Sequence, residues 1–273
     1  MAHFTCNFLS YVLDRAIDIN VIIPGVTSTE AGEAHASHKP RWKFPVLYLL
    51  HGYCNDYSTW ERYTSVERYA EERRIAVVTF SGENNMYMKL SDVKKENPIM
   101  ELEEPDYERL LLHEIPEFVT SMFPVSKKPE DTYLAGLSMG GFGALSNGFR
   151  YPGRFRAVGA FSPLPTQRRE DYKTSDAVPA YLKKYEPIYL INKAKKAGKK
   201  LPDLYYCYGD KDFLFDMQEW FKEKLEEAGI CYTLDVLPDY GHEWAFWDLE
   251  VKKFLDWLPR TDEYYKESKI RPI

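Results

Sequence analysis

Short continuous runs of apolar residues recur along the chain, separated by polar or amphipathic stretches. Runs of this kind are typical of strands buried on both faces of a sheet. An earlier stretch, residues 17–24, alternates between polar and apolar positions and indicates an antiparallel strand near the beginning of the chain. The runs that predict buried strands lie at residues 44–50, 75–80, 132–135, 156–161, 204–208 and 231–237.

Helical periodicity fills most of the intervals between these runs. Residues 26–43 are polar instead and predict a loop, and Pro116 lies inside the first helical stretch and predicts a kink there. The predicted helices span residues 107–123, 142–149, 214–228 and 245–258. Strands that alternate with helices predict an α/β protein with a mostly parallel, twisted central sheet and helices on both faces.

Residues 162–200 interrupt this alternation. They are rich in proline, lysine and tyrosine, and they follow a predicted strand. Open α/β sheets bind their ligands at the carboxyl ends of the strands. We therefore expect residues 1–273 to form a single domain, with a small cap-like insertion at 162–200 over the active-site edge.

The charge and the apolar content exclude several classes of protein. The formal net charge is −6, which argues against a nucleic-acid-binding surface, and the basic run at residues 193–200 is interpreted as a solvated helix end and loop. No apolar stretch approaches the roughly 18 residues that suggest a membrane span. The first residues also lack the basic and apolar segments of a secretory leader. We expect a cytoplasmic protein with no nucleic-acid or membrane partner.

A G-x-S-x-G pentapeptide, Gly136 to Gly140, carries the strongest chemical signal. A predicted strand precedes it and a predicted helix follows it, which is the context of a nucleophile elbow. The sharp turn strains the serine backbone and leaves room only for very small residues two positions away on each side. The motif also occurs by chance, so the prediction that Ser138 is a nucleophile depends on partners elsewhere in the chain.

A serine hydroxyl needs a base, and the base needs an orienting acid. Enzymes with this elbow order them along the chain as serine, acid, histidine. His242 is the one histidine after Ser138 and lies in the predicted turn between the last strand and the last helix. Asp212 is the preferred acid, with Asp210 as its rival. The alternative for Asp212 is a helix N-cap.

Charge that develops on the substrate carbonyl needs hydrogen-bond donors. In this architecture one donor is the N–H of the residue after the nucleophile, and the other comes from an earlier strand–helix loop. Met139 and Tyr53 are the candidates, and Gly52 would allow a close approach of the backbone.

Several motifs together resemble the esterase D-like branch of the α/β hydrolases, which includes tributyrin-type esterases, feruloyl esterases and S-formylglutathione hydrolases. The resemblance implies an α/β-hydrolase fold, assigns the triad acid to Asp212 and assigns an oxyanion N–H to Tyr53. The S-formylglutathione hydrolases usually carry Ser-Gly-Leu-Thr-Cys where this chain has residues 51–55. The matching motifs span residues 49–52, 60, 81–84, 123–126, 136–141, 209–214 and 241–244.

These observations predict a serine carboxylic-ester hydrolase that acts through an acyl-enzyme on short-chain acyl or hydroxycinnamoyl esters. A thioesterase of the S-formylglutathione hydrolase type and an acyltransferase on the same triad are the alternatives. Loop residues at the carboxyl edge are predicted to bind the substrate, although the two tryptophans among them could simply pack the loops. These predicted substrate-binding residues are Trp60, Asn84, Asn85 and Trp244.

No metal and no cofactor are expected, because the four cysteines lie far apart and show no metal-ligand spacing. The predicted partner is a small-molecule ester, with plant cell-wall material as one source. The oligomeric state stays open, with a homo-oligomer as one alternative.

Overall fold

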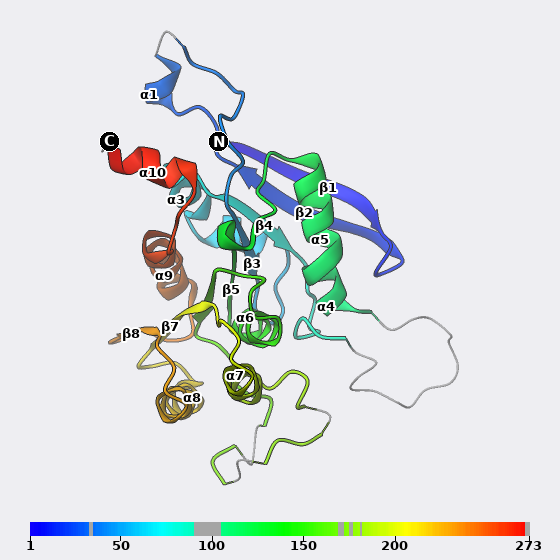
Figure 1. Ribbon diagram of the computed structural model, residues 1–273, viewed down its shortest axis with the longest axis vertical. Helices are drawn as coiled ribbons and strands as arrows, with labels where there is room; N and C mark the ends of the chain where they lie inside the picture. Colours follow the sequence, from blue (N-terminus) through cyan, green and yellow to red (C-terminus); the bar gives the residue numbers. More distant parts are fainter. Residues whose placement is uncertain (33–34, 90–104, 169–171, 175–176, 181, 271–273) are drawn as a thin grey trace.

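The computed structural model of the chain describes residues 1–32, 35–89, 105–168, 172–174, 177–180 and 182–270. Its centre is an eight-stranded sheet in the order β1-β2-β4-β3-β5-β6-β7-β8, with helices packed on both faces (Figure 1). The predicted α/β class and mostly parallel sheet are confirmed.

The parallel strands coincide with the predicted apolar runs. They are β3 (Val46–Leu50), β4 (Ala76–Phe80), β5 (Thr132–Leu137), β6 (Ala157–Phe161), β7 (Asp203–Gly209) and β8 (Thr233–Leu237). Residues in β3, β4 and β6 are all buried, which explains their continuous apolar sequence.

An antiparallel hairpin completes one side of the sheet. Strand β2 (Arg15–Ile23) pairs antiparallel with both β1 (Ala2–Ser10) and β4. The antiparallel strand predicted at residues 17–24 is therefore confirmed, whereas β1 had no counterpart in the prediction. Most positions of β1 are exposed because it is the edge strand, so it lacks an apolar run.

Two groups of helices cover the two faces. One face carries α4 (Tyr107–Arg109), α5 (Ile115–Met122), α6 (Met139–Arg150), α7 (Pro187–Lys196) and α8 (Phe215–Glu227). The other carries α2 (Thr59–Tyr63), α3 (Val66–Glu72) and α9 (Trp244–Trp257). Short α1 (Ser28–Ala31), the 3-10 turn Pro129–Asp131 and α10 (Glu263–Ile270) are the remaining α- and 3-10 helices among the described residues.

The helical stretch at 107–123 is interrupted before its proline rather than at it. Residues Leu110–Glu114 form a π-helical segment between α4 and α5, and Pro116 lies in the first turn of α5. A proline is tolerated there because the first N–H groups of a helix have no intrahelical partner.

Part of the expected insertion belongs to the helical layer. Helix α7 packs against α6 and α8 on one face of the sheet, which leaves the segment before α7 as the candidate for the predicted cap. Residues 169–171, 175–176 and 181 of that segment lie outside the described residues. Among the helices that the structure does describe, none has the length and apolar character needed to cross a membrane.

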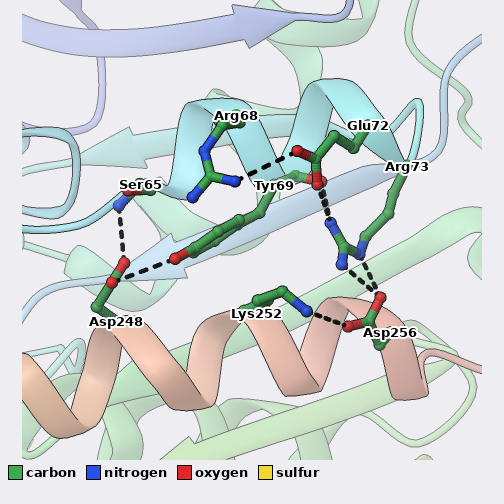
Figure 2. Close-up of polar contacts among 8 residues, drawn as sticks. All are labelled: Ser65, Arg68, Tyr69, Glu72, Arg73, Asp248, Lys252 and Asp256. Atoms are coloured by element: carbon green, nitrogen blue, oxygen red, sulfur yellow. Dashed lines mark hydrogen bonds and ion pairs between the residues drawn. The ribbon is translucent and has the colours of Figure 1, made fainter.

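Helix α9 is docked by polar contacts as well as by the core (Figure 2). The Asp248 carboxylate accepts hydrogen bonds from the N–H of Ser65 at 2.7 Å and from the hydroxyl of Tyr69 at 3.2 Å. In the last turn of α9, Asp256 forms an ion pair with Arg73 at 2.5 Å. Because α9 begins two residues after His242, these contacts hold one end of the loop that carries the candidate base.

Candidate active site

The candidate nucleophile Ser138 lies between β5 and α6 in a strained backbone conformation, with φ 53° and ψ −114°. The glycines two positions before and after it are required because a side chain at either position would collide with the backbone. A Cβ atom on Gly136 would lie 2.5 Å from the carbonyl of Gly140, and one on Gly140 would lie 2.5 Å from the Leu50 oxygen and 2.6 Å from the His51 oxygen. All three distances are far below van der Waals contact, so the turn closes only with glycine at these positions.

Substitution of Gly140 by alanine is therefore expected to lower kcat by about 100-fold, because the turn must open and displace Ser138 relative to its partners. The contrasting variant is Gly153→Ala, where a Cβ atom would meet nothing within 4 Å although φ is +91°. Gly153→Ala should lose some thermal stability through backbone strain and keep its kcat. Equal kcat values for the two variants would contradict this account of the elbow.

Asp212 and His242 meet at the ends of neighbouring strands. The Nδ1 atom of His242 lies 2.9 Å from Oδ2 and 3.1 Å from Oδ1 of Asp212. The loop after β8 reaches β7 because Gly209 has no side chain: a Cβ atom there would lie 2.0 Å from the Tyr240 oxygen. That oxygen accepts a hydrogen bond from the N–H of Lys211 at 2.9 Å. Backbone contacts thus bring the two side chains together.

The Asp212 carboxylate is buried and has other donors besides His242. The N–H of Leu214 donates to Oδ1 at 2.8 Å, and the Gln218 side-chain amide donates to Oδ2 at 3.3 Å. Burial by itself raises the pKa of this carboxyl, but the hydrogen bond and charge interaction with His242, together with the Leu214 N–H, bring the pKa below its ordinary value. Asp212 therefore stays ionised and can hold the proton of His242 on Nδ1.

The rival carboxylate points to a different partner. Oδ1 of Asp210 accepts a hydrogen bond from the N–H of Asp239 at 2.7 Å, which ties the end of β7 to the loop after β8. Asp210 thus supports the loop that carries His242, while Asp212 contacts the imidazole itself.

Both predicted oxyanion donors lie beside the elbow. Met139 is the first residue of α6 and is buried, and N–H groups in a first helical turn have no intrahelical acceptor. They also lie at the positive end of the helix dipole. A Cβ atom on Gly52 would lie 3.4 Å from Cβ of Ser138, so the loop that continues into Tyr53 passes directly beside the serine.

The structure corrects the prediction for Trp60, which is completely buried and donates its indole N–H to the Leu50 oxygen at 3.0 Å. A covered side chain cannot line an open pocket, so Trp60 packs the loop. Trp244 is partly exposed and stacks on the exposed ring of Tyr63 with centroids 4.9 Å apart. Of the two predicted tryptophans, Trp244 alone can reach a bound molecule.

The two predicted asparagines lie in the loop after β4 and have different surroundings. Oδ1 of Asn84 accepts a hydrogen bond from the N–H of Cys54 at 2.8 Å. Asn85 donates to the Glu83 carboxylate within its own loop at 3.4 Å. Asn84 therefore contacts the loop after β3 that carries Tyr53, whereas the side-chain hydrogen bond of Asn85 stays within the loop after β4.

Sequence reasoning missed two residues around the histidine. Phe213 is 75% exposed and its ring lies 4.6 Å from that of His242. Gln218, buried in α8, donates to Asp212 and, at 3.4 Å, to the Pro163 oxygen. The position of Phe213 next to the predicted acid was a usable signal, whereas nothing in the local pattern marks Gln218.

A strained serine between strand and helix, set in a mostly parallel eight-stranded sheet, defines the chain as an α/β hydrolase. The sequence model of the putative esterase family matches residues 34–254, and the chain belongs to this family. The acetyl esterase of Caldicellulosiruptor saccharolyticus is 28% identical to the chain over 283 residues, which cover 96% of this chain and 100% of that protein.

Two solved structures from Staphylococcus aureus resemble this chain along almost its whole length. The fluorophosphonate-binding serine hydrolase FphF has a TM-score of 0.75 at 26% identity, with 95% of this chain and 99% of that one covered. The S-formylglutathione hydrolase FrmB has a TM-score of 0.73 at 26% identity, with 94% and 96% covered. The chain is therefore an esterase of the serine hydrolase class.

Proposed function

We propose that the protein hydrolyses carboxylic esters through an acyl-enzyme, with Ser138, His242 and Asp212 as its triad. The observation that carries the proposal is the ionised Asp212 held 2.9 Å from Nδ1 of His242, at the strand edge that also presents the strained Ser138. A serine hydroxyl gains its nucleophilic power from such a histidine–carboxylate pair.

In the first half-reaction, Ser138 Oγ attacks the ester carbonyl carbon while Nε2 of His242 takes the hydroxyl proton. The imidazolium that forms is stabilised by Asp212, and the negative carbonyl oxygen accepts hydrogen bonds from the N–H groups of Met139 and Tyr53. Collapse of this intermediate breaks the bond to the alkoxy oxygen, which leaves as the alcohol with the proton of His242. The acyl group stays on Ser138 as an ester.

In the second half-reaction, water replaces the alcohol. His242 takes a proton from the water as its oxygen attacks the acyl carbon, and the same two N–H groups stabilise the second tetrahedral intermediate. The proton then passes to Ser138 Oγ as the acid leaves. The net reaction consumes one ester and one water and produces one acid and one alcohol.

Exposed aromatic rings near the site support short-chain or hydroxycinnamoyl esters as substrates. Phe213, Tyr53 and Tyr63 each leave more than half of their surface open to solvent, although large rings are normally covered. Phe213 touches the candidate base, and Tyr63 stacks on Trp244. An aromatic acyl group would find stacking partners on this surface.

A thioester substrate is the second candidate, supported by the 26% identity to FrmB over 94% of the chain. The same triad would serve, with a thiolate as the leaving group in place of an alkoxide. Residues 51–55, which depart from the Ser-Gly-Leu-Thr-Cys stretch typical of S-formylglutathione hydrolases, weigh against it.

A substrate panel distinguishes these possibilities. We expect kcat/KM to be higher for p-nitrophenyl acetate and butyrate than for the octanoate, measurable turnover of methyl ferulate, and slower turnover of S-formylglutathione. A kcat/KM for S-formylglutathione above all of the oxyesters would favour the thioesterase. Absence of turnover with every compound in the panel would contradict the proposed function.

A further inference from the structure

Left-handed backbone conformations are concentrated at one edge of the sheet. Among the described residues, nine that are not glycine have a positive φ, and each such residue costs about 1 kcal/mol or more unless its surroundings hold it. Seven of the nine lie in loops that follow the carboxyl ends of the parallel strands β3 to β8: Cys54, Glu83, Met86, Tyr87, Ser138, Ser162 and Asp239. Four of these seven belong to the loops after β3 and β4.

Three hydrogen bonds from the loop after β4 hold residues 51–54 of the loop after β3, which we call the oxyanion loop. The N–H of Gly82 donates to Nε2 of His51 at 2.9 Å, and the hydroxyl of Tyr87 donates to the His51 oxygen at 3.2 Å. The third bond runs from the N–H of Cys54 to Oδ1 of Asn84 at 2.8 Å. Since Nε2 of His51 accepts, its proton is on Nδ1, which donates to the Gly52 oxygen at 2.7 Å.

His51 can accept that bond because its ring is neutral. Burial is the main cause that lowers the pKa of His51 below its ordinary value. Through its two ring nitrogens, His51 thus links the Gly52 oxygen to the N–H of Gly82 in the loop after β4.

Tyr87 anchors this second loop to the helix that begins at the candidate nucleophile. Its ring occupies the space beside two glycines: a Cβ atom on Gly82 would lie 2.3 Å from the ring, and one on Gly143 in α6 would lie 2.6 Å from it. The side chain of Asn147, also in α6, donates to the Tyr87 oxygen at 3.1 Å. The loop after β4 and Ser138 therefore share one rigid frame.

Of the three hydrogen bonds between the two loops, the one made by Asn84 lies nearest to Tyr53, because its donor is the next residue, Cys54. This bond holds the N–H side of the peptide that joins Tyr53 to Cys54, while the side-chain amide of Asn55 donates to the Tyr53 oxygen of the same peptide at 3.0 Å. Cys54 has a left-handed conformation, with φ 61°. Without an acceptor for this N–H, Cys54 can relax toward negative φ and turn the neighbouring peptide of Tyr53.

We infer that Asn84 is a positioning residue that aims the N–H of Tyr53 at the carbonyl oxygen of the substrate, and that it does not bind the substrate itself. This inference rests on the proposed function, because it requires Tyr53 to be an oxyanion donor. It replaces the role predicted for Asn84 from the sequence.

The test is Asn84→Ala with p-nitrophenyl butyrate as substrate. The hydrogen bond from an oxyanion donor to the carbonyl oxygen is stronger in the transition state than in the ground state. Displacement of the donor therefore lowers kcat and leaves KM nearly unchanged. Loss of a whole donor costs about 100- to 1000-fold, and a misaligned one should cost about 10-fold. Affinity for a trifluoromethyl ketone analogue, whose tetrahedral adduct carries the oxyanion, should fall by a similar factor.

Two further variants separate positioning from other effects. Asn84→Leu keeps the volume but removes the acceptor, so it should lose as much kcat as Asn84→Ala. Asn7→Ala, whose side chain donates to Asp18 within the β1–β2 hairpin, should behave like the wild type. Because Asn84 and Asn7 are exposed, all three variants should unfold at nearly the wild-type temperature.

Three results would overturn the inference: wild-type kcat in Asn84→Ala, a raised KM at constant kcat, or a loss in Asn84→Ala that Asn84→Leu restores. A raised KM at constant kcat would instead support the role predicted from the sequence, in which Asn84 binds the substrate. Failure of the proposed function has a different signature, since the wild-type protein would then hydrolyse no ester in the panel, or Ser138→Ala would remain active.

Discussion

Ser138→Ala should fold like the wild type and lose kcat for p-nitrophenyl butyrate by about 10⁴-fold or more. The hydroxyl oxygen is the atom that forms the acyl-enzyme, and no other group in the proposed mechanism can replace it. The fold should tolerate the change because alanine and serine differ by one oxygen and face the same strain at φ 53°.

The measurement pairs steady-state kinetics with labelling by a fluorophosphonate, which bonds covalently to an activated serine. The wild type should take up one equivalent of label, and Ser138→Ala should take up none. The variant should retain a small rate above water, because the oxyanion donors and the binding surface remain. Near wild-type turnover in Ser138→Ala would disprove the proposed nucleophile.

Asp212→Asn should lower kcat by about 10⁴-fold, because it is expected to stabilise the wrong tautomer of His242. The N–H of Leu214 lies 2.8 Å from Oδ1 and needs an acceptor there, so the amide oxygen of asparagine should take that position. The amide NH₂ then replaces Oδ2, which is 2.9 Å from Nδ1 of His242. A donor at that place forces the imidazole proton onto Nε2. Nε2 can then no longer accept the proton of Ser138.

Gln218 can adjust to this change. Its amide oxygen has no hydrogen-bond partner in the described structure, so rotation of the amide would present an acceptor to the new NH₂ group. The variant should therefore stay folded and lose activity through the tautomer alone, which thermal unfolding can confirm.

The matched control is Asp210→Asn, which should lose less than about 10-fold in kcat. Its amide oxygen can still accept from the N–H of Asp239, the contact that the carboxylate makes at 2.7 Å. A larger loss in Asp210→Asn than in Asp212→Asn would reverse the assignment of the acid.

The sheet was predictable from the sequence because strands covered on both faces must be apolar throughout, as β3 and β4 are. Strand β1 was not, since one edge of it pairs with β2 and the other has no strand partner, and most of its side chains are exposed. The π-helical segment before α5 was also missed, because its apolar residues follow nearly the same spacing as an α-helix.

Candidate site residues could be proposed from the sequence where chain order carries information, but not where their contacts reach across the fold. Ser138 and His242 follow from a motif and from order, and the choice of Asp212 is supported by its distance from the imidazole. The roles of Trp60 and Asn84 could not be read from their loops. The ring of Trp60 is buried in the core, and the side chain of Asn84 accepts a hydrogen bond from Cys54, 30 positions earlier in the chain.

The left-handed residues also limit how this protein can be made more stable. Glycine relieves such a conformation, and at the β1–β2 turn Asp14, with φ 49°, offers that change at a residue outside the proposed site. In the loops after β3, β4 and β5 the same change would release strain by freeing the segments proposed to aim Ser138 and the N–H of Tyr53. Thermostability and turnover are thus in conflict in these loops, so selection for heat resistance at constant turnover should leave them unchanged.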